Sequence, residues 1–379
     1  MVKLLGLTWD HPRGYDPLVK TLPYFHEMYP EIEICWEKRS LTEFGNAPLG
    51  EFSEKYDLMI IDHPSIGEAI IENAIVRMDE LIGMNTTSEI SSEFVGLSLQ
   101  SYRYKDALWA LPVDAACQVS ARRPDLLSTA PVTWGNVMQI AKRTAKEGGP
   151  KVAIPLDPTS CFCSFVTLYS NKGGIPYGEQ AKLDKSQTTI VLEFLSDLYE
   201  LVHPRSVELN PPEMLDMMST TDEILYIPLI FGYSNYSRIG FRESPIIFEN
   251  IPSAGLGPVG SILGGAGISI SRHCPAPAIA AEYAEWITSS EVQKEQYFLV
   301  GGQPAHISAW ENEKVNSLSK CFFTRTRSTI DNAFLRPRAA GFIDVQIESG
   351  KLIHEFLRNN LDAKMVANNM KVVVEKHML

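Results

Sequence analysis

Residues 4–16 read LLGLTWDHPRGYD, an apolar run that leads into a polar and aromatic turn. The run predicts a buried strand over residues 3–8. The turn holds the first side chains that we predict to bind a ligand, namely Trp9, Asp10, His11, Arg13 and Tyr15. Asp16 and Pro17 then predict a helix start, with Asp as N-cap and Pro at the first helical position. Strands that end in this way build binding sites in α/β proteins, because their carboxyl ends open into a crevice.

The stretch YDLMIIDH at 56–63 repeats this arrangement and delivers Asp62 and His63 at its exit. A helix is predicted after it over 65–74, and the alternating residues 32–37 predict a further strand. Strand–helix alternation predicts a mostly parallel sheet covered by helices. A simpler interpretation of the first turn is that Trp9 covers the core and the charges are solvated. We favour binding, since loops at strand ends carry function disproportionately.

Composition limits the class of protein. The chain has 379 residues and a net charge of −12 at pH 7, which predicts two domains and argues against a nucleic-acid partner. No apolar run approaches the roughly 18 residues of a spanning helix, so we expect no membrane insertion. Only four apolar or small residues separate Lys3 from Thr8, too few for a signal peptide. The sequence as it stands predicts a cytoplasmic protein, or a periplasmic one if the chain was trimmed.

Further elements follow from periodicity and capping signals. A helix is predicted around Leu18 to Met28, either kinked at Pro23 or beginning at Thr21. Other helices are predicted to start at Trp134, after Asp157 and at Pro277, and to cover 190–202, 342–357 and 361–376. Strands are predicted at 151–156, 224–231 and 267–271. The segment at 107–114 also resembles a strand, and we expect Pro112 to break it.

Three more places supply candidate ligand-binding residues. Asp114 closes the segment at 107–114, and Phe162 and Cys163 lie at a predicted turn-to-helix start. Tyr233 and Tyr236 lie in a loop after the strand at 224–231. Aromatic rings stack on sugar faces or cationic heterocycles, and carboxylates accept hydrogen bonds from hydroxyl groups. Several such side chains at strand ends are what a pocket needs.

The same residue types also allow other chemistries. The fingerprint GxGxxG is matched at 255–260, but no strand leads in and no helix follows, so a crossover loop is favoured and no cofactor is expected. Asp10, His11, Asp62, His63 and Asp114 lack tight metal-ligand spacing, so no metal is expected. A thiol at a helix start is activated, which makes Cys163, or Cys161, a candidate nucleophile.

The order of segments resembles the extracellular solute-binding proteins of bacterial ABC importers, the maltose-binding type. The segments that carry the resemblance are YDLMIIDH at 56–63, VRMDELI at 76–82, YKDALWALPVDAACQVSARRPDLL at 104–127, PVTWGNVMQIAK at 131–142, GGAGISISR at 264–272, AAEYAEWITSSEVQKEQ at 280–296 and GGQPAH at 301–306. Each segment alone is weakly specific, whereas their order and spacing together are specific for the fold.

The resemblance implies a two-lobed periplasmic-binding-protein fold of class II, with a ligand cleft between the lobes. Carried over, one lobe holds residues 1–109 and 255–308, and the other holds 113–252 and 312–379, with crossovers near 110–113, 251–256 and 308–312. Gln303, in the compact turn at 301–305, joins the predicted ligand-binding residues.

The sequence therefore predicts a binding protein that closes on a small polar organic ligand, with a carbohydrate as the first expectation. It would serve uptake or sensing, with an ABC permease as its partner if the chain is exported. The alternative is an enzyme on the same fold with Cys163 as nucleophile, in a thiaminase-like transfer or hydrolysis.

Overall fold

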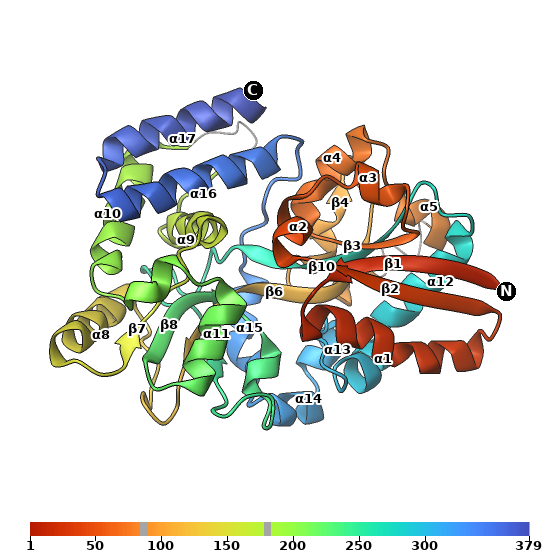
Figure 1. The fold of residues 1–379 in the computed structure, drawn as a ribbon, viewed down its shortest axis with the longest axis horizontal. Coiled ribbons are helices and arrows are strands. Elements are labelled where there is room, and N and C mark those ends of the chain that lie inside the picture. The colour runs from red at the N-terminus through yellow and green to blue at the C-terminus, as the bar shows by residue number, and fades with distance from the viewer. Residues whose placement is uncertain (84–89, 178–182, 379) are drawn as a thin grey trace. The chain divides into compact units, whose positions relative to one another are not determined.

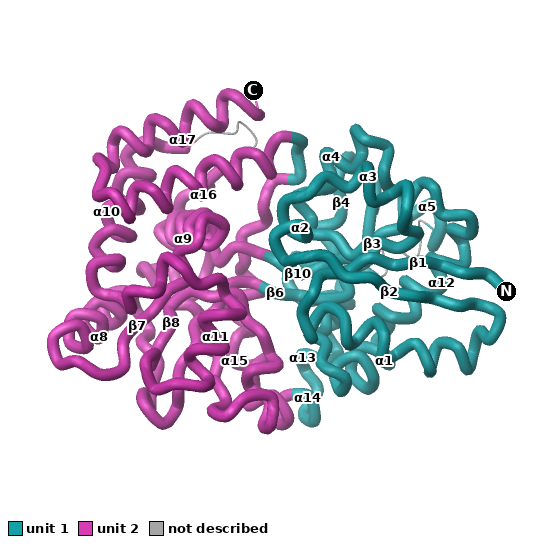
Figure 2. The backbone as a smooth tube through the Cα atoms, in the orientation of Figure 1, with its two compact units in different colours: residues 1–116, 264–315, 338–340 teal, residues 117–263, 316–337, 341–379 magenta. Residues whose placement is uncertain are grey.

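The computed structural model describes residues 1–83, 90–177 and 183–378, which fold into two compact α/β units (Figure 2). Unit 1 consists of residues 1–116, 264–315 and 338–340, and unit 2 of residues 117–263, 316–337 and 341–379. Each unit is assembled from segments far apart in the sequence. The lobe boundaries that the sequence predicts, 1–109 with 255–308 and 113–252 with 312–379, remain a prediction.

The sheet of unit 1 has the strand order β2-β1-β3-β10. Its strands are β1 (Val2–Trp9), β2 (Ile32–Arg39), β3 (Leu58–Ile61) and β10 (Leu263–Ile270). Strands β2, β1 and β3 are parallel, whereas β10 is antiparallel to β3. All four residues of β3 are fully buried, because β3 lies between two other strands in the middle of the core. The parallel arrangement brings the carboxyl ends of β1, β2 and β3 to one edge.

Helices cover both faces of this sheet. Helix α1 (Pro12–Met28) contacts β2 and α12 (Pro277–Thr288), and α2 (Leu41–Asn46) contacts β1 from the other face (Figure 1). The other elements of unit 1 are α3 (Gly50–Ser53), η1 (His63–Ser65), α4 (Ile66–Ile71), α5 (Met78–Ile82), η2 (Ile90–Ser92), α7 (Ser98–Ser101), β4 (Arg103–Tyr104), β5 (Ala107–Leu108), the π-helix η5 (Val292–Tyr297) and α13 (Ile307–Trp310). Helix α14 (Glu313–Leu318) is divided equally between the two units.

Helix α1 begins earlier than the sequence predicts. His11 is its N-cap, with Nδ1 accepting a hydrogen bond from Arg13 N at 3.0 Å, and Pro12 takes the first helical position. The predicted start at Asp16 and Pro17 is wrong. Pro17 lies inside the helix because burial of its apolar side, through Leu18 and Phe25, outweighs the lost backbone hydrogen bond.

The strands of unit 2 are β6 (Leu111–Arg122), β7 (Lys151–Val152), β8 (Ile224–Phe231) and β9 (Ile247–Glu249). β6 pairs antiparallel with β8 and β9, and β7 pairs parallel with β8. The first residues of β6 belong to unit 1, so this strand connects the two units along the chain. The predicted break at Pro112 falls instead at 109–110, and Pro112 is the second residue of the strand.

The helical part of unit 2 is built around α9 (Pro158–Asn171), which contacts α10 (Lys185–Tyr199) and α16 (Phe342–Asn359). Its other elements are α8 (Trp134–Glu147), η3 (Pro204–Val207), α11 (Pro211–Thr220), η4 (Ser234–Ser237), α15 (Phe322–Asp331) and α17 (Ala363–Met378). Most residues of α9 are buried, so this helix forms the centre of the unit 2 core. Among the described helices, none is long and apolar enough to cross a membrane.

Helix α8 starts at Trp134, as the cap residue Thr133 predicts, and Thr133 and Asn136 form a capping box. Thr133 Oγ1 accepts from Asn136 N at 3.2 Å, and Asn136 Oδ1 accepts from Thr133 N at 3.3 Å. Thr133→Ala is expected to lower the free energy of unfolding by about 1 kcal/mol. Thr159→Ala is the control, because the helix there is capped by Asp157 instead. Urea denaturation measures both, and an equal loss in the two variants would contradict the capping role.

Candidate functional site

Polar side chains gather at the carboxyl edge of the unit 1 sheet. Trp9 and Arg39 end the neighbouring strands β1 and β2 as register partners, and Asp62 follows β3 directly. Asp10 follows Trp9 and its backbone N–H donates to Arg39 O at 2.7 Å. Residues from three strands therefore share one edge, as the parallel topology predicts.

Trp9 is buried rather than open to solvent, with 4% of its surface exposed. Its ring lies 5.0 Å from the Phe44 ring of α2. On its other side a Cβ at Gly14 would come within 2.3 Å of the indole, so only glycine lets α1 start this close to the strand. Trp9 thus fixes both α1 and α2 at the strand end.

Arg13 and Asp114 form a buried ion pair within unit 1. Arg13 Nε donates to Asp114 Oδ2 at 2.7 Å, and Nη2 donates to Oδ1 at 2.5 Å. This two-point geometry matches a guanidinium fork to a carboxylate. Burial raises the pKa of the Asp114 carboxyl, and the positive charge of Arg13 offsets part of that rise. Gln303 lies nearby, with Nε2 donating to Ala115 O at 2.8 Å.

Two predicted residues, Asp10 and Tyr15, remain accessible beside Lys38. Asp10 Oδ1 accepts from Lys38 Nζ at 2.7 Å, and the same ammonium lies 5.0 Å from the centre of the Tyr15 ring. Asp10 is well exposed, whereas Tyr15 and His11 are half-buried. An exposed carboxylate beside a ring and a cation can exchange its partner for a ligand hydroxyl at little cost.

Asp62 and His63 form the exit of β3. Asp62 is the N-cap of η1 and its Oδ1 accepts from His63 N at 2.9 Å. The His63 ring is fully buried and stands edge-on to the Tyr102 ring at 6.3 Å. Asp62 keeps 15% of its side chain exposed, so it is the accessible member of this pair.

The predicted residues of unit 2 are packed into its interior. The Phe162 ring lies 5.6 Å from Tyr177 and 6.0 Å from Phe342. Tyr236 donates its hydroxyl to Asp216 Oδ1 at 2.8 Å, and the Tyr233 ring stands edge-on to Tyr236 at 6.4 Å. Packing within unit 2 accounts for these aromatic side chains.

The cysteine pair does not lie at a helix start. Helix α9 begins at Pro158, so Cys163 is in its second turn and is 3% exposed. Cys161 Sγ donates to Leu156 O at 3.1 Å, and burial raises the pKa of this thiol well above its usual range. An activated nucleophile needs an electropositive and partly exposed thiol, and Cys161 is not one. The helix predicted after Asp157 does begin there, whereas the placement of Cys161 to Cys163 at its start is wrong.

The loop at 255–260 lacks the context of a dinucleotide fingerprint. Gly255, Gly257 and Gly260 adopt positive φ angles, and no helix follows them before β10. Asn171 Nδ2 donates to Val259 O at 2.7 Å and so ties this loop to the end of α9. Among the described residues, no group of three or more histidine, cysteine, aspartate or glutamate side chains could hold a metal ion.

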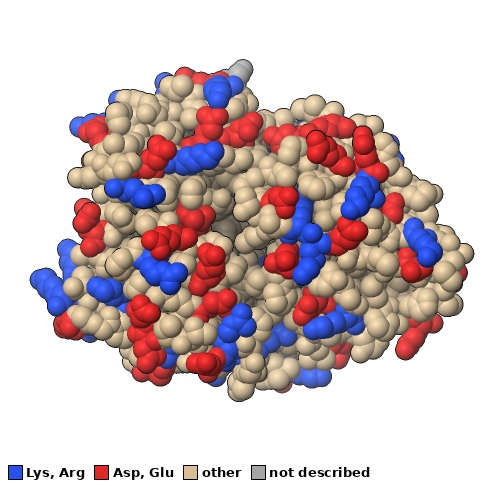
Figure 3. Space-filling view, viewed as in Figure 1, with Lys and Arg blue, Asp and Glu red and all other residues tan. Residues whose placement is uncertain are grey.

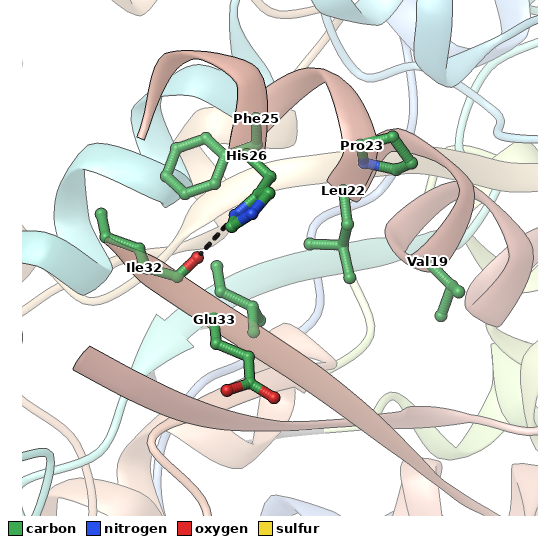
Figure 4. Close-up of a pocket in the computed structure, with 8 residues that line it drawn as sticks. Val19, Leu22, Pro23, Phe25, His26, Ile32 and Glu33 are labelled. Atoms are coloured by element: carbon green, nitrogen blue, oxygen red, sulfur yellow. Dashed lines mark hydrogen bonds between the residues drawn. The ribbon is translucent and has the colours of Figure 1, made fainter. Parts of the chain in front are cut away.

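Among the residues that the structure describes, two of the hollows lie away from the carboxyl edge of the unit 1 sheet. One of about 360 Å³ lies between α1 and β2 and is lined by Val19, Leu22, Pro23, Phe25, His26, Ile32, Glu33 and Ile34 (Figure 4). His26 Nδ1 lies 3.2 Å from Ile32 O at its centre. The other, of about 350 Å³, lies between α16 and α17. Neither hollow is lined by a predicted site residue.

Basic and acidic side chains are interspersed on the face of the molecule shown in Figure 3, so neither sign of charge dominates that face.

The sequence-based site omits Arg39. The predicted strand ended at Glu37, whereas β2 continues to Arg39. The signal that points to it is the topology, because each parallel strand delivers its last residues to the same edge.

The family model described as bacterial extracellular solute-binding protein matches residues 45–322. The chain is similar in structure to maltose-bound MalE3 of T. maritima, at 16% identity and a TM-score of 0.84, covering 99% of this chain and 100% of that one.

Two further structures are similar. A ribitol complex of an ABC transporter solute-binding protein from Agrobacterium radiobacter K84 has 17% identity and a TM-score of 0.82, covering 99% of this chain and 98% of that one. An α-D-tagatose complex of such a protein from Thermotoga lettingae TMO has 14% identity and a TM-score of 0.81, covering 99% and 100%. These likenesses confirm the predicted fold.

Proposed function

Because the chain belongs to the bacterial extracellular solute-binding protein family, we propose that it binds a carbohydrate or polyol at the carboxyl edge of the unit 1 sheet. The family match over residues 45–322 carries this proposal. The family consists of solute-binding proteins rather than enzymes, and the buried cysteines of α9 give the cysteine-enzyme alternative no support.

The side chains at this edge suit a polyhydroxylated ligand. The accessible carboxylates of Asp10 and Asp62 can accept hydrogen bonds from hydroxyl groups, and Tyr15 offers the face of a half-buried ring. Charge-assisted hydrogen bonds of this kind are about twice as strong as neutral ones. Relatives of similar fold hold maltose, ribitol and tagatose, which are ligands of this chemistry.

The proposed partner is the permease of an ABC importer, and the proposed compartment lies outside the cytoplasmic membrane. The description of the matching family as extracellular supports the compartment, and similar structures described as ABC transporter solute-binding proteins support the partner. The other predicted ligand residues of unit 1, Trp9, His11, Arg13, His63, Asp114 and Gln303, would hold the accessible ones in place through the contacts described above. For Phe162, Cys163, Tyr233 and Tyr236 of unit 2, ligand binding stays a prediction.

A thermal-shift screen against sugars, polyols, amines, carboxylates and vitamins tests the proposal. A ligand at a hundred times its Kd stabilises the folded protein by about 2.7 kcal/mol, which moves the unfolding temperature measurably. We expect stabilisation by sugars or polyols. Stabilisation by amines or vitamins alone would overturn the proposed ligand class.

Asp10→Asn tests the position of the site. Losing a charged acceptor is expected to weaken ligand binding about tenfold, while the ligand-free unfolding temperature changes little because exposed ion pairs contribute 0–1 kcal/mol. Glu33→Gln is a matched control, since Glu33 forms a similar exposed pair with Lys3, at 2.9 Å, at the opposite end of the same strands. Calorimetric titration measures the ligand affinity of both variants. Equal affinities of Asp10→Asn and Glu33→Gln would show that the ligand binds elsewhere.

A further inference from the structure

Arg39 is a buried cation at the edge where we propose that the ligand binds. It is the last residue of β2 and is 5% exposed. Its Nη2 donates to Ile60 O at 3.1 Å. The centre of its guanidinium lies 5.5 Å from the Phe44 ring and 5.0 Å from the Phe52 ring. Two aromatic rings and one carbonyl are thus its main neighbours.

The guanidinium has hydrogen-bonding capacity to spare. Arg39 Nε and Nη1 have no hydrogen-bond partner among the residues that the structure describes, and no described carboxylate forms an ion pair with them. Glu37 accepts from Lys55 Nζ and the Tyr56 hydroxyl, and the first acid after Arg39, Glu43, uses its Oε2 to accept from Ser40 N and Ser40 Oγ, at 2.9 and 2.8 Å. Burial lowers the pKa of Arg39 to about 10, and the negative charge of Glu43 offsets only part of this effect.

Burying a charge without a counter-ion is costly, and arginine is almost never buried unless it is paired. Two other buried arginines, Arg13 and Arg123, show how such a charge is ordinarily held. Arg13 is held by Asp114 at two points, and Arg123 by Asp125 and Asp222 together with two backbone carbonyls. Arg39 differs from both, because none of the described residues forms an ion pair with it, and this indicates a counter-ion that the ligand supplies.

The segment that covers Arg39, which includes helix α2, can move away from it at low energetic cost. Helix α2, which carries Phe44, has no buried residue, and both Phe44 and Phe52 are only half-buried. A segment with few buried contacts opens at low cost. The Phe44 ring packs on Trp9 as well as on Arg39. Displacement of the Phe44 ring would therefore open the proposed ligand edge and expose the Arg39 guanidinium at the same time.

We propose that Arg39 binds an anionic group of the ligand, so that the solute is an acidic carbohydrate, such as a uronic acid or a sugar phosphate. This inference rests on the proposed carbohydrate binding. A net charge of −12 disfavours anions in general, so an acidic ligand needs a fixed cation at its site. A guanidinium that keeps free N–H groups in a water-poor site supplies it.

The test compares matched neutral and acidic sugars on the full chain. Calorimetric titration uses D-glucose against D-glucuronate, D-galactose against D-galacturonate, and D-glucose 6-phosphate, at equal ionic strength. We expect at least one acidic sugar to bind tenfold or more tightly than its neutral counterpart, and the preference for carboxylate or phosphate identifies the anionic group. Added salt is expected to weaken acidic binding more than neutral binding.

Variants separate the role of Arg39 from folding. Arg39→Gln is expected to remove the preference for the acidic sugar, and Arg39→Lys to keep part of it. Arg143→Gln, which removes an exposed arginine from α8, is the control for net charge and is expected to change nothing. Equal affinity for acidic and neutral sugars, or an acidic preference that survives Arg39→Gln, overturns the inference alone. A chain that binds none of these sugars and is stabilised by no other carbohydrate or polyol overturns the proposed function as well.

Discussion

Asp114→Ala is expected to lower the free energy of unfolding by about 3–5 kcal/mol, the usual effect of breaking a buried ion pair. Arg13 is 4% exposed and Asp114 is 2% exposed, and both carboxylate oxygens accept hydrogen bonds from the guanidinium. Removing the carboxylate leaves the Arg13 charge inside unit 1 without its counter-ion. Urea denaturation followed by tryptophan fluorescence measures the loss.

The double variant Arg13→Met with Asp114→Leu is the matched control for Asp114→Ala. Replacing both charges by apolar side chains of similar volume is often neutral, because the cost of removing the ions from water disappears with them. We expect the double variant to be more stable than Asp114→Ala. A single variant that loses less than about 1 kcal/mol would show that the pair is not buried as the structure has it.

Gly350→Ala is expected to destabilise unit 2 by about 3 kcal/mol, at the upper end of the usual cost of overpacking. A Cβ at Gly350 in α16 would lie 2.2 Å from Pro158 O, at the start of α9. Since the obstructing atom belongs to the backbone, a side-chain rotation cannot relieve the contact, and the two helices must separate.

Gly135→Ala is the matched control for this contact. Gly135 also lies in a helix, but the nearest atom to its Cβ would be Thr133 Oγ1 at 3.7 Å. Alanine there is expected to leave stability unchanged or to raise it by about 0.5–1 kcal/mol, through helix propensity. If both alanine variants lose stability equally, the α9–α16 contact is not the cause.

Local signals predict many of the elements closely. The starts of α8 and α12 are predicted correctly, because a threonine cap or a proline at the first position fixes a helix start within a few residues. The start of α1 is wrong because histidine is an unusual cap, while Asp16 and Pro17 carry the stronger local signal. The strand predicted at 151–156 pairs only at Lys151–Val152, since pairing depends on a distant partner.

The candidate site is harder to predict than the fold. The sequence predicts that Trp9, Asp10 and Asp62 follow parallel strands, and topology then brings them to one edge. It cannot tell an aromatic residue that lines a pocket from one that packs, and Tyr236 is held by Asp216, twenty positions earlier in the chain. Arg39 is missed because its burial depends on α2 and α3, whose packing is a tertiary property.

The pairing of β3 with β10 has a consequence for how the protein is made. Ser269 Oγ donates to Met59 O at 2.9 Å across a separation of 210 residues. A ribosome adds about 5–20 residues per second, so the apolar edge of LMII at 58–61 waits roughly 10 s or more for its partner. Unpaired apolar strand edges recruit other chains. Nascent chains that end before residue 263 are therefore expected to depend on chaperones, and completed ones to be released from that dependence.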